Sequence, residues 1–486
     1  MIKKILKILG IIVLVFIIIL IVKALTVSSK QVEVKETIPY KIDIMTVAKH
    51  LSEAIQIPTI SNHDSSKTDT KPFEQFHTFL AKTYPKLHKT LKKEVVKGYA
   101  LLYTWKGSDP SLKPILLMAH QDVVPVDAVT LDQWTHPGFS GAIADGYIWG
   151  RGALDVKNAL ISIMESVEYL VNKGFVPKRT IYVAFGHDEE VGGEGAKAIA
   201  KLLKDRNVQL EYVLDEGGAI MEGALPGISN PIAMVGIAEK GYLTLKLTVK
   251  GTGGHSSMPP HHTALGVLAR ALVAIENNPF PKEIKGPAQQ MFEYVTPHMN
   301  FPLKVMFANM WCFKPLLKWQ FEKAESSNAI MRTTVALTMA GASEKDNILP
   351  TQAWAMINCR ILPGETMEST TAYIKKVIDN EAVLIESTPW SNDPSPVSDI
   401  NAPSFHSIAT ITRQIDNSII VAPYLVLGAT DSRNYNALTN QIYRFTPVKM
   451  NNEDLKRTHG INERISISDM GKSVKFFIAL IEKTHQ

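Results

Sequence analysis

The sequence is poor in cysteine and has no concentrated block of one charge. Cys312 and Cys359 are its only cysteines, which excludes a disulfide framework and a thiolate zinc site of the finger type, although one bridge between the two remains open. The formal net charge is +5, but lysines cluster only before the apolar N-terminus, and no Arg-aromatic stripe is present. We therefore expect no nucleic-acid partner. Without a disulfide framework or a finger-type zinc site, stability must come from a buried core; internal repeats are absent as well.

What is present is the composition of an ordinary globular protein, with 45% hydrophobic and 20% charged residues. A chain of 486 residues is longer than one compact core usually sustains. We therefore expect two domains, or one large domain that carries an insertion.

A long hydrophobic run stands at the N-terminus. Residues 8–22 are all apolar, lysines flank the run on both sides, and neighbouring apolar residues extend it to the roughly 20 residues that a bilayer requires. We interpret residues 1–27 as an uncleaved single-pass membrane anchor. The preceding lysines should stay in the cytoplasm, which puts the rest of the chain on the non-cytoplasmic side. The alternative is a secreted protein, with a signal peptide cleaved near Val27 and Ser29.

From about residue 40 the chain alternates strand-like and helix-like segments, which predicts an α/β fold with a mostly parallel sheet. Strands are expected at 114–119, 180–185 and 211–214, and a helix at 156–171. Beyond Gly241 the pattern becomes that of an antiparallel sheet with helices on one face, with strands at 242–249, 332–339 and 353–361 and a helix at 262–275. We predict a main domain formed by residues 40–236 and 389–486, interrupted by an inserted α+β domain at 237–388.

Residues able to bind metal recur at four places, each at or near the end of a predicted strand. They are His120 with Asp122, Asp155 after a glycine-rich turn, the pair Glu189–Glu190, and the pair Asp215–Glu216. Any one of these acids alone would most often be a solvated loop carboxylate or a helix cap. In an open α/β sheet, however, ligand sites form at the carboxyl ends of the strands. Their recurrence therefore predicts one shared crevice.

Several carboxylates in one crevice repel one another and lose hydration unless cations neutralise them. Carboxylate oxygens mixed with imidazole suit Zn²⁺, with Mn²⁺ or Co²⁺ as substitutes. Two ions that share a water lower its pKa, and one of them can polarise a carbonyl group. The pattern therefore favours a two-metal hydrolase with a further carboxylate as the base.

These motifs resemble those of the M20 family of metallopeptidases, and more closely its branch of carboxypeptidase S and the N-acyl-amino-acid hydrolases. The resemblance extends from about residue 40 to the C-terminus. It is carried by the segments 120–126, 134–141, 150–155, 189–190, 253–256, 358–364 and 459–463. It implies that the main domain is a zinc-hydrolase catalytic domain and that the inserted domain is a lid and dimerisation domain.

The resemblance also implies a role for individual residues. Five would hold two zinc ions per subunit: Asp155, which bridges both, His120 and Asp215 at one ion, and Glu190 and His459 at the other. Glu189 would be the general base, and Asp122 would orient the imidazole of His120. His459 lies in a polar stretch, and its assignment as a metal ligand depends on the resemblance alone.

In the inserted domain, the resemblance implies that His255 stabilises the oxyanion, reaching across from a partner subunit of a homodimer. Asn347 and Arg360 would bind substrate, and Arg360 could hold a carboxylate with two hydrogen bonds. The alternative for Arg360 is an edge-strand arginine paired with a neighbouring acid. The loop 428–433 would close around the substrate.

The expected activity is hydrolysis of the amide bond next to a free amino-acid carboxylate, in N-acyl amino acids or at the C-terminus of short peptides. The competing interpretation is a catalytically silent receptor or scaffold, although such proteins usually lose ligands. A serine nucleophile is excluded because Ser256 and Ser257 lack the strand-to-helix elbow.

The apolar stretch 301–319 is typical of core; our hypothesis is that it lines an acyl-chain slot or contacts the membrane.

Overall fold

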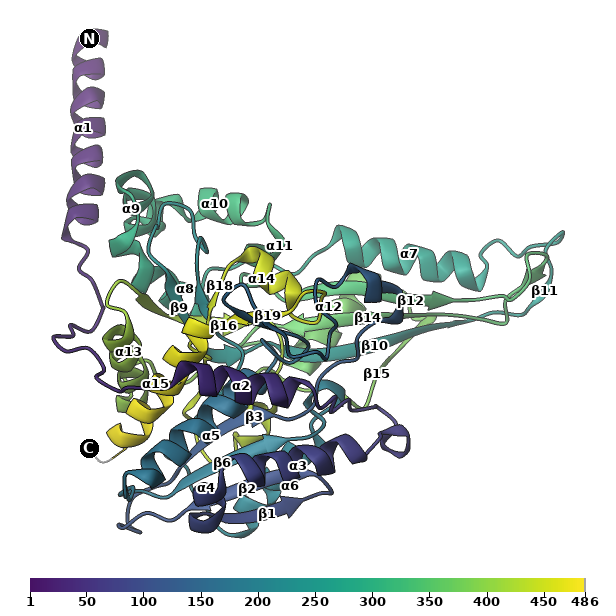
Figure 1. Cartoon of the computed structure of the whole chain (residues 1–486). Coiled ribbons are helices and arrows are strands. Elements are labelled where there is room, and N and C mark those ends of the chain that lie inside the picture. The colour runs from purple at the N-terminus through teal and green to yellow at the C-terminus, as the bar shows by residue number, and fades with distance from the viewer. Residues whose placement is uncertain (485–486) are drawn as a thin grey trace.

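The computed structural model describes residues 1–484. Its main body is a large mixed sheet with helices on both faces (Figure 1). The strands follow one another across the sheet as β1 (Lys92–Val96), β2 (Ala100–Trp105), β6 (Ile181–Gly186), β3 (Ile115–His120), β7 (Val213–Asp215), β17 (Ile442–Arg444), β9 (Ile232–Glu239), β8 (Ile220–Met221) and β18 (Lys449–Met450), with β16 (Ile420–Val426) paired to β9.

The centre of this sheet is parallel. β3 pairs in parallel with β6 and β7, and β7 pairs in parallel with β17. All six residues of β3 are buried, because helices cover both faces of a parallel sheet. The α/β fold expected from the sequence is confirmed. Antiparallel pairs occur toward the margins, where β1 joins β2, β2 joins β6, and β8 and β17 join β9.

The two faces of the sheet belong to separate hydrophobic clusters. Along β3, Leu117 faces the larger cluster and Leu116 the smaller one, as the two-residue period of a strand requires. One face is covered by α2 (Ile44–Ile55), α3 (Lys71–Thr83), α4 (Pro85–Thr90), α5 (Lys157–Asn172), α13 (Pro403–Ile415) and α15 (Ile467–Lys483), and the other by α6 (Glu194–Asp205).

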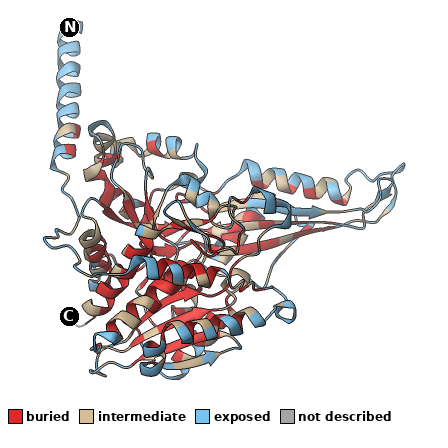
Figure 2. Ribbon diagram, viewed as in Figure 1, coloured by how far each residue is buried: buried red, intermediate tan, exposed pale blue. Residues whose placement is uncertain are grey.

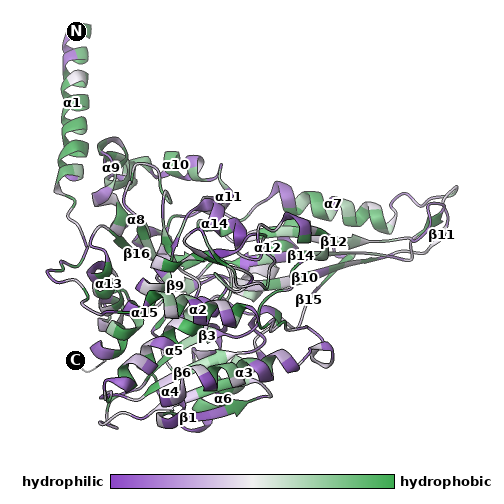
Figure 3. Cartoon of the chain, in the orientation of Figure 1, coloured by the Kyte–Doolittle hydropathy of each residue, from purple (hydrophilic) through white to green (hydrophobic). Residues whose placement is uncertain are grey.

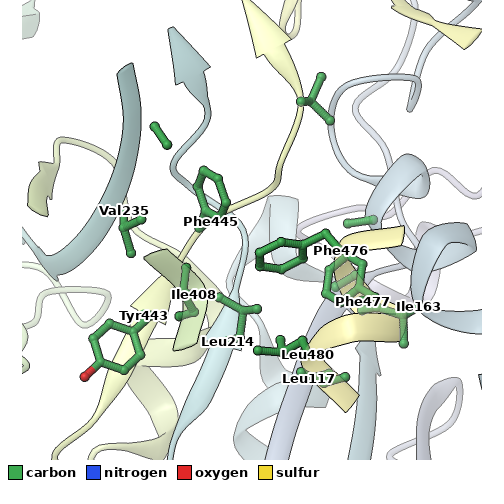
Figure 4. Close-up of a cluster of buried hydrophobic side chains, with 14 of the residues drawn as sticks. Leu117, Ile163, Leu214, Val235, Ile408, Tyr443, Phe445, Phe476, Phe477 and Leu480 are labelled. Carbon is green, nitrogen blue, oxygen red and sulfur yellow. The ribbon is translucent and has the colours of Figure 1, made fainter. Parts of the chain in front are cut away.

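Figure 4 shows the centre of the larger cluster. Leu117 and Leu214 from the strands meet Ile163 of α5 and the side chains of Phe476 and Leu480 of α15. Burying each such side chain contributes about 1.5–3 kcal/mol. This packing holds the strand ends, and so the loops that follow them, in fixed positions.

A second sheet extends away from the main body (Figures 1 and 2). It is antiparallel, in the order β12 (Thr334–Gly341), β14 (Gln352–Ile361), β10 (Gly241–Lys250) and β15 (Val383–Ser387), with α7 (Ala264–Asn277) and α12 (Met367–Ile378) packed on it. The small pair β11 (Gly254–His255) and β13 (Ile348–Leu349) lies at its outer tip. Burial alternates along β14, as the sequence pattern predicts for a sheet covered on one face.

The range 237–388 expected for the inserted domain contains a further group of helices: α8 (Gly286–Val295), α9 (Phe301–Ala308), α10 (Met310–Phe321) and α11 (Glu325–Ala329). These pack on the main body, since Met291, Phe307 and Leu317 belong to its hydrophobic cluster. The chain therefore leaves the main body after β9, returns for α8 to α11, and leaves it again for β12.

Helix α1 (Ile2–Thr26) projects from the main body, and its surface is almost entirely apolar (Figures 1 and 3). Within residues 1–484 it is the one helix long and apolar enough to cross a membrane.

Both cysteines are free. The remaining elements are a small sheet of β4 (Ile143–Ala144), β5 (Tyr147–Trp149) and β19 (Arg464–Ser466), the helix α14 (Asn452–Arg457), and the 3-10 turns η1 (Ser65–Lys67), η2 (Ala128–Gln133), η3 (Glu189–Val191), η4 (Thr296–His298) and η5 (Asp431–Tyr435).

Candidate metal centre and active site

The parallel strands bring their terminal residues to one edge of the sheet. His120 is the last residue of β3, Glu189 and Glu190 lie in the turn after β6, and Glu216 directly follows β7. Asp155 precedes α5, and the peptide bond that follows it is cis. The convergence predicted from the four sequence positions is therefore observed.

Asp155 lies between two histidines. Its Oδ1 is 3.1 Å from Nε2 of His120, and its Oδ2 is 3.0 Å from Nε2 of His459. A second carboxylate accompanies each histidine: Oε1 of Glu216 is 3.0 Å from Nε2 of His120, and Oε2 of Glu190 is 3.2 Å from Nε2 of His459. The cluster therefore has two halves that share Asp155.

The sequence predicts Asp215 as the partner of His120, whereas the structure has Glu216 beside that histidine. Asp215 is turned the other way, and its Oδ2 accepts a hydrogen bond from the backbone N–H of Ser432 at 2.9 Å. Neighbouring side chains at a strand end point to opposite sides, so only one of the two acids can face the cluster. Asp215 instead anchors the loop 428–433.

Asp122 is fully buried behind His120 and holds its ring. Nδ1 of His120 lies 2.9 Å from the main-chain oxygen of Asp122 and 3.3 Å from its Oδ1. The same carboxylate accepts hydrogen bonds from Ser61 Oγ and from the backbone N–H groups of Glu189 and Glu190. Burial alone would raise the pKa of Asp122, but the hydrogen bonds from His120 and Ser61 outweigh it and lower this pKa. Asp122 thus directs Nε2 of His120 toward the other acids.

Arg151 and Glu463 form a buried ion pair under the cluster, with Nη1 and Oε2 2.6 Å apart. Oε1 of Glu463 accepts three backbone N–H groups between residues 152 and 155, at 2.7–3.1 Å. Nη2 of Arg151 donates to the main-chain oxygen of His459 at 3.1 Å. The pair therefore ties the turn that carries Asp155 to the loop that carries His459. Both residues lie in the motifs 150–155 and 459–463, but nothing in the sequence indicates that they pair.

The raised pKa values of groups in the cluster indicate that the cluster attracts positive charge. Burial raises the pKa of Glu189 well above its usual range. Burial and the negative charge of Asp155 raise the pKa of Glu216 to about 8. Hydrogen bonds to Asp155 and Glu190 raise the pKa of His459 to about 10. Protons thus occupy sites where the acids would otherwise repel one another.

The arrangement of the donor atoms fits divalent cations. One ligand atom each from His120, Asp155 and Glu190 lies within 4.8 Å of the others, and the same holds for His120, Glu189 and Glu216. Among the described residues, no group donates a hydrogen bond to the buried Oε1 of Glu190. A buried acceptor without a donor is costly, and a cation between these ligands would satisfy it.

An apolar cavity of about 380 Å³, here called the inner cavity, opens beside Asp155 and Glu216. Apart from these acids its walls are mostly apolar, and they include Met221, Met234 and Met450. A second cavity of about 370 Å³, the outer cavity, lies between α9 and α10. Leu225 lines both cavities, so they adjoin at this side chain.

Comparison with known proteins identifies the family. Residues 116–483 match the sequence family described as Peptidase family M20/M25/M40. The chain belongs to the M20 family. It is 41% identical to probable carboxypeptidase S-like 2 of Dictyostelium discoideum, over 96% of this chain and 92% of that protein. It is also 41% identical to the N-fatty-acyl-amino acid synthase/hydrolase PM20D1 of Xenopus tropicalis, over 89% of this chain and 85% of that protein. The M20 resemblance and its carboxypeptidase S branch are confirmed.

The M20 fold is also evident from solved structures. The M20 family metallo-carboxypeptidase Sso-CP2 from Sulfolobus solfataricus superposes with a TM-score of 0.66 at 17% identity, over 92% of this chain and all of that one. At 17% identity, the similarity between the two structures shows a shared fold and nothing further. This chain is therefore an M20 hydrolase with the fold expected from its sequence.

Arg360, predicted to bind the substrate of this M20 chain, lies on β14 between β12 and β10 and so not on an edge strand. Its guanidinium carbon lies 4.6 Å from the ring centre of Tyr242, and its Nε donates to Oδ1 of Asn358 at 3.1 Å. No aspartate or glutamate within residues 1–484 forms an ion pair with it. Burial and, less strongly, the charge of Arg433 lower the pKa of Arg360. A half-buried guanidinium without an acid beside it suits an incoming anion.

His255 and Asn347 lie at the outer tip of the second sheet, remote from the candidate metal cluster of the same chain (Figure 1). Both are exposed. They are close to each other, because the N–H of Ser256 donates to the main-chain oxygen of Asn347 at 3.2 Å. A single chain therefore does not bring these two predicted residues to the site.

Proposed function

We propose that the chain is a two-zinc amidohydrolase that cleaves the amide bond next to a free amino-acid carboxylate. The observation that carries this proposal is the position of Asp155, each of whose oxygens faces a different histidine-glutamate pair. His120 and Glu216 would hold one ion, His459 and Glu190 the other, and Asp155 both. Zn²⁺ suits this donor set, with Mn²⁺ or Co²⁺ as substitutes. When bound, the two ions would lower the pKa of a shared water and polarise the substrate carbonyl.

Glu189 is the proposed general base. One of its carboxylate oxygens lies within 4.8 Å of ligand atoms of His120 and Glu216, and burial raises its pKa, so it holds a proton more readily than a surface glutamate. It would take a proton from the attacking water and deliver it to the departing amine nitrogen. Asp122 is a positioning residue, because it acts through the ring of His120.

Arg360 is proposed to bind the substrate carboxylate through its free guanidinium N–H groups. His255 and Asn347 are proposed to act from a second copy of the chain in a homodimer. Their remoteness from the cluster of their own chain supports this arrangement, as does the family resemblance. His255 of the partner subunit would then stabilise the oxyanion of the tetrahedral intermediate.

The inner cavity favours a long acyl chain over a dipeptide. Its apolar wall begins at Asp155 and Glu216, where the scissile amide must lie. The lining includes a few polar side chains, such as Ser326, Thr446 and Asn452, but it is mostly apolar, so the charged amino group of a dipeptide would lose much of its hydration there, which is costly. Each buried methylene of an acyl chain instead contributes about 0.8 kcal/mol. We therefore propose N-fatty-acyl amino acids as the preferred substrates.

Residues 1–27 are proposed to remain attached as a single-pass anchor, with the catalytic body on the non-cytoplasmic side. Leu20 and Ala24 of α1 are buried against the body. Nδ2 of Asn309 donates to the main-chain oxygen of Leu20 at 3.0 Å. A signal peptide that is removed has no need of such contacts, so they support the anchor over a secreted form.

The test is hydrolysis of N-oleoyl-phenylalanine, N-acetyl-leucine and glycyl-leucine by the full-length protein in detergent. We expect N-oleoyl-phenylalanine to be cleaved with the highest kcat/KM, and a chelator or Glu189→Gln to abolish cleavage. Glu211→Gln, which changes a partly exposed acid outside the cluster, should have no effect. Zinc bound without cleavage of any substrate would overturn the proposal and favour a silent scaffold.

A further inference from the structure

Helix α9 lies beside the base of α1, and α10 follows on the far side of α9 (Figure 1). Asn309, which joins the two helices, donates to the main-chain oxygen of Leu20. The ring of Trp311 meets the ring of Phe16 edge to face, with centroids 6.0 Å apart. Phe16 lies one turn beyond Leu20, so Trp311 reaches along α1 away from the body. The helix pair therefore stands where α1 enters a membrane.

The outer face of this helix pair is apolar and exposed. It consists of Phe301, Leu316, Trp311 and Trp319, and we call it the portal face. Trp311 is 60% exposed and Trp319 54%. Nζ of Lys323 lies 3.4 Å from the ring centre of Trp319. Tryptophan with lysine is typical of helices that lie in a membrane interface.

The length of α1 indicates how deep this face lies. The part of α1 between its last N-terminal lysine and the buried Leu20 is residues 8–19, which span about 18 Å. The hydrocarbon core of a bilayer is about 30 Å thick. Lysine side chains that reach to the surface supply part of the difference. The rest would come from the level of Leu20 to Val22, beside which α9 packs. With α1 as the proposed anchor, the portal face would lie at the outer-leaflet interface.

The outer cavity lies directly under this face. Met306 and Leu303 of α9 line one side of it, and Leu316 and Phe321 of α10 the other. Leu316 is also exposed on the portal face, so the cavity borders that face. At its inner end Leu225 lines both this cavity and the inner cavity, so the two adjoin at that side chain. The two cavities thus lie in succession between the portal face and the acids Asp155 and Glu216, with Leu225 between them.

We propose that α9 and α10 form a membrane portal, through which the acyl chain of a membrane-dissolved N-acyl amino acid reaches the metal cluster. The lipid bilayer that holds α1 is the occupant of the portal face. This inference rests on the proposed function for its substrate class. Its physical reason is that transfer of an acyl chain into water costs about 0.8 kcal/mol per methylene, and a path through the portal avoids that transfer.

The first test measures whether the portal face touches lipid, independently of activity. Full-length protein is placed in phosphatidylcholine vesicles with brominated acyl chains, and quenching of tryptophan fluorescence is recorded. We expect W311F/W319F to lose most of the quenching. W390F is the matched control, because Trp390 is 58% exposed but stacks with Lys197 of α6; it should be quenched like the unaltered protein. Equal quenching in W311F/W319F and the unaltered protein would overturn the proposal.

The second test measures passage through the outer cavity. Met306→Trp should narrow that cavity and lower, by about tenfold, the ratio of kcat/KM for vesicle-bound N-oleoyl-phenylalanine to kcat/KM for N-acetyl-leucine. Any misfolded fraction of the protein lowers both kcat/KM values by the same factor, so it leaves this ratio unchanged. Met339→Trp, at an exposed methionine of β12, should leave the ratio unchanged. An unchanged ratio in Met306→Trp would overturn the portal.

The two tests separate failure of the portal from failure of the proposed function. If the unaltered protein cleaves N-acetyl-leucine but not N-oleoyl-phenylalanine, the fatty-acyl substrate class is wrong, and the portal falls with it. If it cleaves both substrates and quenching persists in W311F/W319F, the amidohydrolase stands and the portal is overturned. Loss of quenching in W311F/W319F together with a lowered ratio in Met306→Trp supports both.

Discussion

His459 Nε2 lies 3.0 Å from Oδ2 of Asp155, although one residue precedes α5 and the other belongs to a loop near the C-terminus. The buried pair Arg151–Glu463 holds these two segments together. The half of the candidate metal cluster that contains His459 therefore depends on residues that would not themselves touch a metal ion.

This dependence predicts a large effect of Arg151→Met on stability. The substitution leaves the buried Glu463 without its counter-ion, and breaking a buried pair in this way typically costs about 3–5 kcal/mol. The free energy of unfolding, measured by denaturant titration, should fall by that amount. Lys201→Met removes the exposed pair with Asp205 and should change it by less than about 1 kcal/mol. Equal effects of the two substitutions would contradict this role of Arg151.

The positions of Asp215 and Glu216 predict that their substitution affects metal content and activity differently. Glu216→Gln should remove one bound ion and lower kcat/KM by at least a hundredfold, because its carboxylate lies 3.0 Å from Nε2 of His120. Asp215→Asn keeps an acceptor for the N–H of Ser432 and should retain both ions. Metal content by mass spectrometry, together with kcat/KM, distinguishes the two. If Asp215→Asn lost an ion and Glu216→Gln did not, Asp215 would be the ligand beside His120, as the sequence predicts.

Arg360 should act mainly through the carboxylate of the substrate. Arg360→Gln should lower kcat/KM by roughly tenfold to a hundredfold, since hydrogen bonds between charged groups contribute about 1.5–3 kcal/mol. The loss should be much smaller for a substrate whose carboxylate is replaced by a carboxamide. Equal losses on both substrates would show that Arg360 does not bind the carboxylate.

Lys240 gives the protein a predictable dependence on pH. It is buried, and burial lowers its pKa to about 7, well below that of an unfolded lysine. At low pH the folded protein must bury a charged ammonium group. Between pH 7 and the pKa of the unfolded lysine, the unfolded chain binds more protons, so stability rises with pH. The free energy of unfolding should therefore increase from pH 7 to pH 10 relative to Lys240→Met. A constant difference would contradict the lowered pKa.

Most of the fold could be predicted from the sequence because the hydrophobic periods are clear. The strands near 115, 181 and 242 and the helix near 157 lie where their patterns indicate. The chain's return to the main body as α8 to α11 could not be predicted, since apolar side chains such as Phe307 and Leu317 do not specify which core they join. The stretch 301–319 illustrates the same limit, because part of it is core and part is exposed.

Much of the candidate site could also be predicted, because strand ends that share an edge must converge. The choice between Asp215 and Glu216 could not, since adjacent acids at a strand end are equivalent in sequence and only their side-chain directions separate them. The pairing of Arg151 with Glu463 likewise depends on a contact between distant segments. His255 and Asn347 lie at the site only if a second chain contributes them, and nothing in a single sequence shows that contact.

Anomalous diffraction at the zinc edge, from crystals of the zinc-loaded protein, would show directly whether Asp155 bridges two metal ions. We expect two peaks, one on either side of the Asp155 carboxylate, the first beside His120 and Glu216 and the second beside His459 and Glu190. A single peak, or a peak coordinated by Asp215 in place of Glu216, would contradict this assignment.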